Sequence, residues 1–236
     1  MQVLLVSDIH ANRCALEAVF ERFDSVDEVW CLGDIVEYGP CPGACIDLVR
    51  RHCRHVVQGN HDASFADPEA PGWGRLDRHT VSAEDMAYLR GLPASISVTA
   101  DDASYLLVHG SPLDPLSGRL EPDMAPAQLG EAVAGSRASH VLCGHTHKAM
   151  IAEADGHVIA NTGTVGQPRD GDYRAQCMVL DDGVLRFERV DYDLDALARD
   201  YAASSLPEPM KKEWFDYTRR GIVDVHGLQL GPFSAR

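Results

Sequence analysis

The chain has 236 residues, 45% of them hydrophobic, and its 36 acidic against 21 basic side chains give a net charge of −15. That length and composition are enough for one buried core. The acidic excess argues against a broad nucleic-acid surface, although bound dications could still attract a small anionic substrate. No apolar stretch is long enough for a membrane span, and the first predicted strand follows Met1 and Gln2 directly, so we expect a cytoplasmic protein without membrane attachment. Seven cysteines without an export signal favour reduced thiols.

Five short apolar runs in the first 147 residues each end in Asp, Asn or His. Runs of this length, bounded by turn residues, predict buried strands. They cover residues 3–6, 29–32, 55–58, 105–108 and 140–143. If these strands lie side by side in parallel sheets, their carboxyl ends share one edge, and crevices at that edge are where open α/β sheets bind ligands.

Helical patterns lie between these strands. Asn12 is the predicted N-cap of the first helix, and Ser82 with Asp85 marks the start of another. Apolar spacing predicts further helices near residues 45–53 and 125–134.

The pattern becomes β-rich after residue 148. Strands are predicted at 149–153, 157–161, 175–180 and 184–190, followed by helical spacing in the tail and near 210–218. This change favours two β-layers with helices outside. We expect a single domain over residues 1–236, in which residues 191–236 form a mostly helical C-terminal extension packed on it.

The residues that follow the five apolar runs have the chemistry of metal ligands. Asp8 and His10 are two apart in an extended segment and so point to one side, and His145 and His147 share that spacing. Oxygen and nitrogen ligands without thiolate suit Mn, Fe, Zn or Ni. Each motif alone is weak, but their joint occurrence favours one site with enough ligands for two ions. The candidate ligands are Asp8, His10, Asp34, Asn60, His109, His145 and His147.

In this order, the five motifs resemble those of the calcineurin-like metallophosphoesterases. The matching residues are Asp8-x-His10, Gly33-Asp34, Gly59-Asn60-His61-Asp62, His109 and Gly144-His145-Thr146-His147. The resemblance implies a four-layer α-β-β-α sandwich of two mixed sheets flanked by helices, with two divalent ions. One ion would be held by Asp8, His10, Asp34 and His147, and the other by Asp34, Asn60, His109 and His145. His61 would lie beside the ions as the general acid, with Asp62 orienting it.

Two further segments, residues 108–112 and 161–172, resemble the small bacterial phosphodiesterase branch of that superfamily. Its protein Ser/Thr phosphatases carry Asp-Arg-Gly after the second motif, whereas this chain has Glu37-Tyr38-Gly39. The phosphate-clamping Arg of those phosphatases is therefore missing at that position, which favours a phosphodiester substrate.

We expect a small phosphodiester to be hydrolysed by a metal-bridging hydroxide. Two ions about 3.5–4 Å apart can lower the pKa of a bridging water and neutralise phosphate oxygens. The imidazolium of His61 can then protonate the leaving alkoxide. One alternative is a phosphomonoesterase on the same site, acting on a nucleotide, a small molecule or a protein. Another, from a different class, is a non-catalytic scaffold that binds a protein partner through the extension.

Several features keep two interpretations. Arg169 could bind the substrate phosphate, or it could form a salt bridge to Asp170 or Asp172 that only fixes its loop. The long loop over 64–80, with Trp73, Arg75 and His79, could select substrate or could be a solvated excursion. We expect Mn²⁺ to support activity in vitro.

Overall fold

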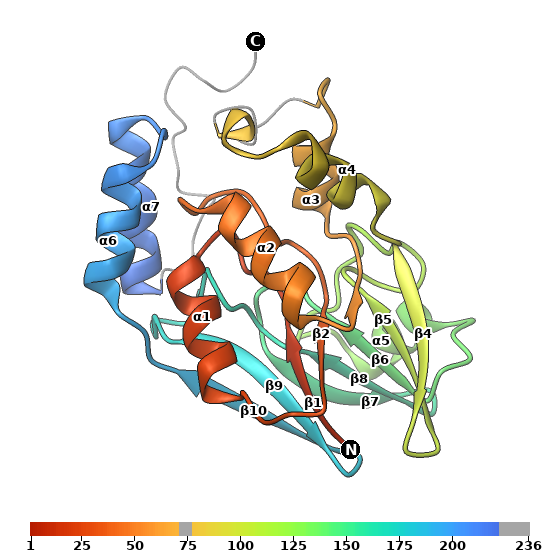
Figure 1. Ribbon diagram of the computed structural model, residues 1–236. Helices are drawn as coiled ribbons and strands as arrows, with labels where there is room; N and C mark the ends of the chain where they lie inside the picture. The colour runs from red at the N-terminus through yellow and green to blue at the C-terminus, as the bar shows by residue number, and fades with distance from the viewer. Residues whose placement is uncertain (71–76, 222–236) are drawn as a thin grey trace.

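Two five-stranded sheets lie against each other in the computed structural model, which describes residues 1–70 and 77–221 (Figure 1). The first sheet has the order β10 (Val184–Val190), β9 (Ala175–Asp181), β1 (Gln2–Val6), β2 (Glu28–Cys31), β3 (His55–Val56). The second has the order β4 (Ser95–Ala100), β5 (Ala103–Val108), β6 (His140–Cys143), β8 (His157–Asn161), β7 (Met150–Ala154). Both are mixed: β1, β2 and β3 are parallel, as are β5, β6 and β8, while β9, β10, β4 and β7 pair antiparallel with their neighbours.

Alternation along the strands builds the core between the sheets. In β1, Val3 and Leu5 belong to the apolar cluster between the two sheets, while Leu4 and Val6 belong to the cluster beneath the helices. Successive side chains of a strand point to opposite faces, so one strand contributes to both clusters. Trp30 of β2 completes the contact from the first sheet, and its ring meets that of Tyr105 in β5 edge-on. The predicted pair of mixed sheets is confirmed.

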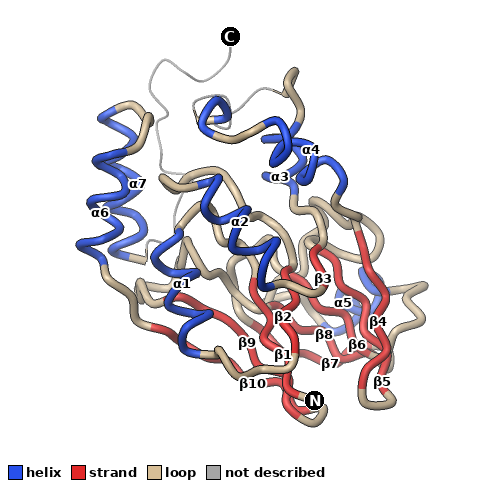
Figure 2. Tube along the Cα trace, in the orientation of Figure 1, coloured by secondary structure: helices blue, strands red, loops and turns tan. Residues whose placement is uncertain are grey.

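The helices form the outer layers and one end of the sandwich (Figure 2). On the first sheet, α1 (Arg13–Arg22) contacts β9, β10 and α2 (Pro42–His52); α6 (Leu194–Ala203) packs on α1 and α7 (Glu208–Arg220) on α6. On the second sheet, α5 (Pro126–Val133) packs against β7. The remaining pair, α3 (Asn60–Ala66) and α4 (Ala83–Gly91), pack on each other. None of the helices in these described ranges combines the length and the apolar character that a membrane span requires.

The helix starts follow their capping residues. The Asn12 side chain accepts a hydrogen bond from the Ala15 N–H, and Ser82 and Asp85 form a reciprocal capping box. Both predicted N-termini are therefore confirmed.

Three elements differ from the expectation. Strand β4 has alternately half-buried and exposed side chains because it lies at a sheet edge, and no apolar run marks it. The helix α3, which begins within the ligand motif at Asn60, continues to Ala66 and so takes up the first three residues of the predicted 64–80 loop. Within the predicted 64–80 loop, a 3₁₀ turn occupies Arg78–Thr80, while Trp73 and Arg75 lie outside the described residues.

We predict that Leu5→Ala lowers the free energy of unfolding by about 2–5 kcal/mol, because it opens a cavity between the two sheets. Leu5 has no exposed surface. Urea unfolding checks this against Val184→Ala, which removes apolar atoms from a side chain that is 57% exposed. An equal, small loss in both variants would contradict the assigned core.

Candidate metal centre

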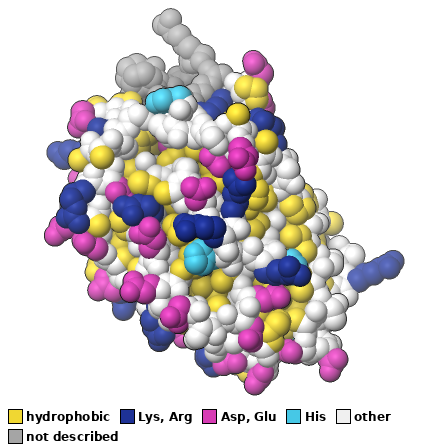
Figure 3. Space-filling model, viewed as in Figure 1, with side chains coloured by type: hydrophobic (Ala, Val, Ile, Leu, Met, Phe, Trp, Pro, Cys, Tyr) yellow, Lys and Arg dark blue, Asp and Glu magenta, His cyan; other side chains and the backbone are white. Residues whose placement is uncertain are grey.

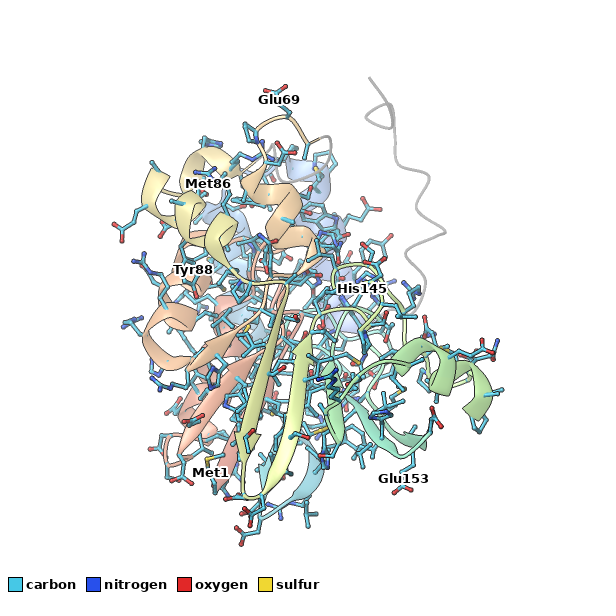
Figure 4. All side chains as sticks on the ribbon, turned by 90° about the vertical axis from the view of Figure 1, so that its right-hand side faces the viewer. Met1, Glu69, Met86, Tyr88, His145 and Glu153 are labelled. Atoms are coloured by element: carbon cyan, nitrogen blue, oxygen red, sulfur yellow. The ribbon has the colours of Figure 1, made fainter. Side chains whose placement is uncertain are left out.

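All seven predicted ligands lie at one end of the sandwich, just beyond the strands. Asp8 and His10 follow β1, Asp34 follows β2, and Asn60 begins α3 after β3. His109 follows β5, and the last two ligands, His145 and His147, follow β6. His145, labelled in Figure 4, lies where the strands end and the loops begin. The parallel pairing of β1 with β2, and of β5 with β6, places these termini at the same edge.

The first ligand group joins Asp8, His10 and His147. The His147 Nε2 atom lies 3.1 Å from Asp8 Oδ1 and 3.0 Å from His10 Nε2. His10 Nε2 is also 3.9 Å from Asp34 Oδ2. All four side chains are buried.

The second group joins Asp34, His109 and His145. His109 Nε2 lies 3.1 Å from Asp34 Oδ2 and 3.1 Å from the amide oxygen of Asn60. That same oxygen is 2.9 Å from His145 Nδ1. Asp34 Oδ2 therefore lies near imidazoles of both groups, as expected for a bridging ligand.

The tautomers of three imidazoles direct lone pairs into this centre. The Nδ1 atoms of His10, His109 and His147 lie 3.2, 2.8 and 2.9 Å from the carbonyl oxygens of Val36, Leu32 and Gln167. A carbonyl can only accept, so each Nδ1 carries a proton, and each Nε2 can bind a cation when it carries none.

Two buried carboxylate oxygens also favour the binding of cations at this site. In the part of the chain that the structure describes, the buried Asp8 Oδ1 and Asp34 Oδ2 have no partner other than the imidazole nitrogens that face them, the nearest being His147 Nε2 and His109 Nε2, each at 3.1 Å. A buried carboxylate carries a large desolvation cost, which an ion would offset. The residues present therefore fit two divalent ions bound by oxygen and nitrogen.

Protonation follows burial and the local negative charge. Burial lowers the pKa of His10 and His147, and it lowers the pKa of His145 to about 4, so these rings are neutral at pH 7 and can bind a cation. Burial also opposes the protonation of His109, but the carboxylates of Asp34 and Asp8 outweigh it and raise its pKa to about 10. Without metal, His109 thus holds a proton where a cation would lie.

The backbone is strained at these ligands. Five of them, Asp8, His10, Asp34, His145 and His147, have φ between 46° and 67°, a left-handed conformation that is uncommon outside glycine. Each such residue costs about 1–3 kcal/mol and persists only where its surroundings impose it. Two glycines permit the close approach: a Cβ at Gly144 would collide with Ser7 and Asp8, and one at Gly59 with Asp34.

His61 lies at the rim of the centre, paired with a carboxylate that the sequence interpretation did not single out. Its Nδ1 is 2.5 Å from Oε2 of Glu37, which is buried. Burial alone would lower the pKa of His61, but Asp34 and the bonded Glu37 raise it above the ordinary value. The phenol oxygen of Tyr38 lies 3.5 Å from the other ring nitrogen, Nε2.

Asp62, expected to orient His61, has different partners. Its carboxylate accepts hydrogen bonds from the backbone N–H groups of Asp34, Ile35 and Gly59, at 2.8–2.9 Å. It therefore ties the turn after β2 to the start of α3, and so fixes the backbone of Asp34.

Arg169 does not form the salt bridge to its neighbouring acids. Asp170 pairs with Arg189, and Asp172 pairs with Arg174 and Arg189. The Arg169 guanidinium instead contacts the Gln167 side chain at 3.0 Å and His147 Nε2 at 3.4 Å, and its buried Nε has no hydrogen-bond partner. Among the described residues no Asp or Glu forms an ion pair with Arg169, whose guanidinium lies beside the group of Asp8 and His147.

The calcineurin-like phosphoesterase superfamily domain matches residues 1–182 of this chain. The chain belongs to this family. A metallophosphoesterase from Sphaerobacter thermophilus is 30% identical, with a TM-score of 0.79, over 94% of this chain and 99% of that one. A hypothetical protein from Pyrococcus horikoshii OT3 has the same fold at 21% identity and a TM-score of 0.80, over 90% of this chain and 97% of that one. An uncharacterized protein of Methanocaldococcus jannaschii is 27% identical over 242 residues, covering 90% of this chain and 97% of its own. The family hydrolyses phosphoesters with divalent metal ions, in agreement with the two ligand groups.

We predict that binding of Mn²⁺ to the metal-free protein releases about one proton per chain at pH 7, because the ion displaces the proton held by His109. The apparent affinity then rises with pH up to the pKa of that ring, which is about 10. Calorimetry in two buffers of different ionisation enthalpy measures the release. His109→Asn, which has no titrating ring, serves as the control and loses it; a wild-type heat independent of buffer would contradict the assignment.

Proposed function

We propose that the protein hydrolyses a small phosphodiester at this centre, with His61 as the general acid. The observation that supports it most is the convergence of two ligand groups on a shared Asp34, directly beside a His held by a buried carboxylate. Two divalent ions, when bound, would supply a water of lowered pKa and neutralise the phosphate oxygens. On this proposal, metal ligands and acid lie within reach of one phosphate.

His61 is suited to protonate the leaving oxygen. Its backbone N–H donates to Asp34 Oδ1 at 2.8 Å, so the ring is anchored to the bridging ligand. Glu37 accepts from Nδ1 and stabilises the imidazolium, so that the proton on Nε2 is the one available for transfer. Nε2 faces the Tyr38 hydroxyl, and we place the leaving group on that side.

The charge around His61 supports a diester over a monoester. The side chains that contact His61 are the Glu37 carboxylate, which is an anion, and the neutral Tyr38 phenol. A monoester dianion would instead be stabilised by cations there. Arg169 lies beside His147 and supplies one positive charge, and we propose that it binds the phosphate. A single cation suits the single negative charge of a diester.

The visible surface supports a small substrate. On the face shown in Figure 3, basic side chains are interspersed with acidic ones and form no continuous basic area. A long nucleic acid would need such an area to neutralise its phosphates. The net charge of −15 adds to that argument.

The proposal is tested by comparing matched aryl phosphodiester and phosphomonoester substrates with Mn²⁺ and after chelation. We expect two bound ions, faster diester hydrolysis, and loss of both activities on chelation. Faster monoester hydrolysis would reassign the substrate class to monoesters. Protein without bound metal or hydrolysis would leave only a non-catalytic scaffold.

We predict that His61→Ala retains both ions but loses turnover, most severely for alkyl leaving groups that need a proton, by about 10²–10⁴-fold. An aryl leaving group of low pKa should suffer far less. His140→Ala, at the opposite end of β6, is the matched control and should leave both rates unchanged. Equal wild-type and mutant rates on an alkyl diester would exclude His61 as the acid.

A further inference from the structure

The C-terminal hairpin, residues 191–221 with α6 and α7, contacts three segments that carry site residues. It lies beyond residues 1–182, which match the family domain, and covers the α1 side of the molecule (Figure 1). Its contacts go to the loop that carries Arg169, to Tyr38, and to the start of α1 after His10.

The first contact fixes the Arg169 loop. The Gly171 N–H donates to the carbonyl of Gly221 at 2.7 Å, where α7 ends in a left-handed residue with φ 57°. The approach is close, since a Cβ at Gly221 would meet the backbone nitrogen of Asp172 at 2.7 Å. The end of the last described helix is thus bonded to the backbone two residues after Arg169.

The second contact fixes Tyr38. The ring of Trp214 in α7, 6% exposed, packs edge-on against Tyr38 with centroids 5.5 Å apart. The Tyr201 hydroxyl of α6 donates to the Tyr38 carbonyl at 3.4 Å. Tyr38 in turn lies with its ring centroid 4.9 Å from that of His61. Trp214 and Tyr201 of the hairpin therefore support Tyr38, which lies beside the proposed acid.

The third contact joins the hairpin to the first ligand segment. The Asn12 amide donates both to the Tyr192 hydroxyl at 3.3 Å and to the Gly166 carbonyl at 3.2 Å. Arg13 forms an ion pair with Asp200 of α6, in which the Nη2 atom of Arg13 lies 2.9 Å from each carboxylate oxygen. The same asparagine thus links the hairpin to the beginning of the Arg169 loop.

These anchors matter because none of the Asp and Glu side chains in residues 1–70 and 77–221 forms an ion pair with Arg169. Its side-chain contacts are Gln167, two residues away, and His147, while the nearby acids bind Arg174 and Arg189. The position of the guanidinium is therefore determined by the backbone of its loop, which is tied at Gly166 and Gly171. A displacement of about 1 Å at a binding group can cost a large factor in rate.

We propose that the C-terminal hairpin is a positioning element for the substrate phosphate. It fixes Arg169 through Gly221 and Tyr38 through Trp214. The inference rests on the proposed function, because it takes Arg169 as a phosphate-binding group. Gly221 and Trp214 contact neither the metal ligands nor the phosphate themselves, and act through the residues they support.

The test uses Gly221→Ala in the full chain, loaded with Mn²⁺, against Gly183→Ala as the matched control. Gly183 also has a positive φ, 80°, but a Cβ there meets nothing within 4 Å, in the turn between β9 and β10. Both variants carry the backbone strain, and only one displaces the Arg169 loop. For Gly221→Ala we expect about a tenfold rise in KM for the diester, kcat within about twofold of wild type, and weaker binding of inorganic phosphate by calorimetry. Metal stoichiometry should stay at the wild-type value.

Trp214 provides an independent arm. Trp214→Ala removes the ring behind Tyr38 and should lower kcat/KM about tenfold without loss of metal, while Trp214→Phe, which keeps a ring there, should restore most of it. A purely structural role would lower the yield or melting temperature of folded protein and leave the KM of the folded fraction unchanged.

Two results separate the failures. If Gly221→Ala matches Gly183→Ala in KM and phosphate binding while wild type hydrolyses the diester, the positioning role is wrong and the proposed function stands. If metal-loaded wild type hydrolyses neither ester, the proposed function is wrong, and the positioning role is overturned with it.

Discussion

The candidate metal centre depends on two buried carboxylate oxygens whose nearest partners are imidazole nitrogens. Asp8 Oδ1 and Asp34 Oδ2 are buried beside the nitrogens of His10, His109 and His147. Such an arrangement disfavours the folded state by several kcal/mol unless positive charge enters it. A proton on His109 supplies part of that charge without metal, and divalent ions would supply the rest.

The sandwich is what sustains this unfavourable arrangement. The apolar contact between the sheets fixes the strand ends. The candidate ligands that follow these strands are therefore held in the left-handed backbone conformation. Asp62 adds a direct tie between the turn at Asp34 and the start of α3. Stability built into the layers thus sustains strain at the centre, as is common at functional sites.

The convergence of the candidate ligands could be predicted from sequence because each follows a strand, and strand ends are local features. Glu37 could not, because its contact with His61 depends on the left-handed turn at Glu37 and Tyr38, which brings position 37 back against α3. A Glu three residues after a strand-end Asp is the only signal, and it resembles any turn acid. The roles of Asp62 and Arg169 depended on which partners the fold delivers: backbone N–H groups for the first, and Arg189 from β10 taking the acid beside the second. Strand β4 was not predicted because it has no apolar run. As an edge strand, it has one exposed face and one face that is only half-buried.

Anomalous scattering from crystals grown with Mn²⁺ would show whether the two ligand groups hold metal ions. We expect two peaks per chain, one among Asp8, His10 and His147 and one among Asn60, His109 and His145, both within coordinating distance of Asp34. About 2.0–2.2 Å is the usual metal–ligand distance for such nitrogen and oxygen ligands. A single peak, or peaks away from Asp34, would contradict the paired site on which the proposed chemistry depends.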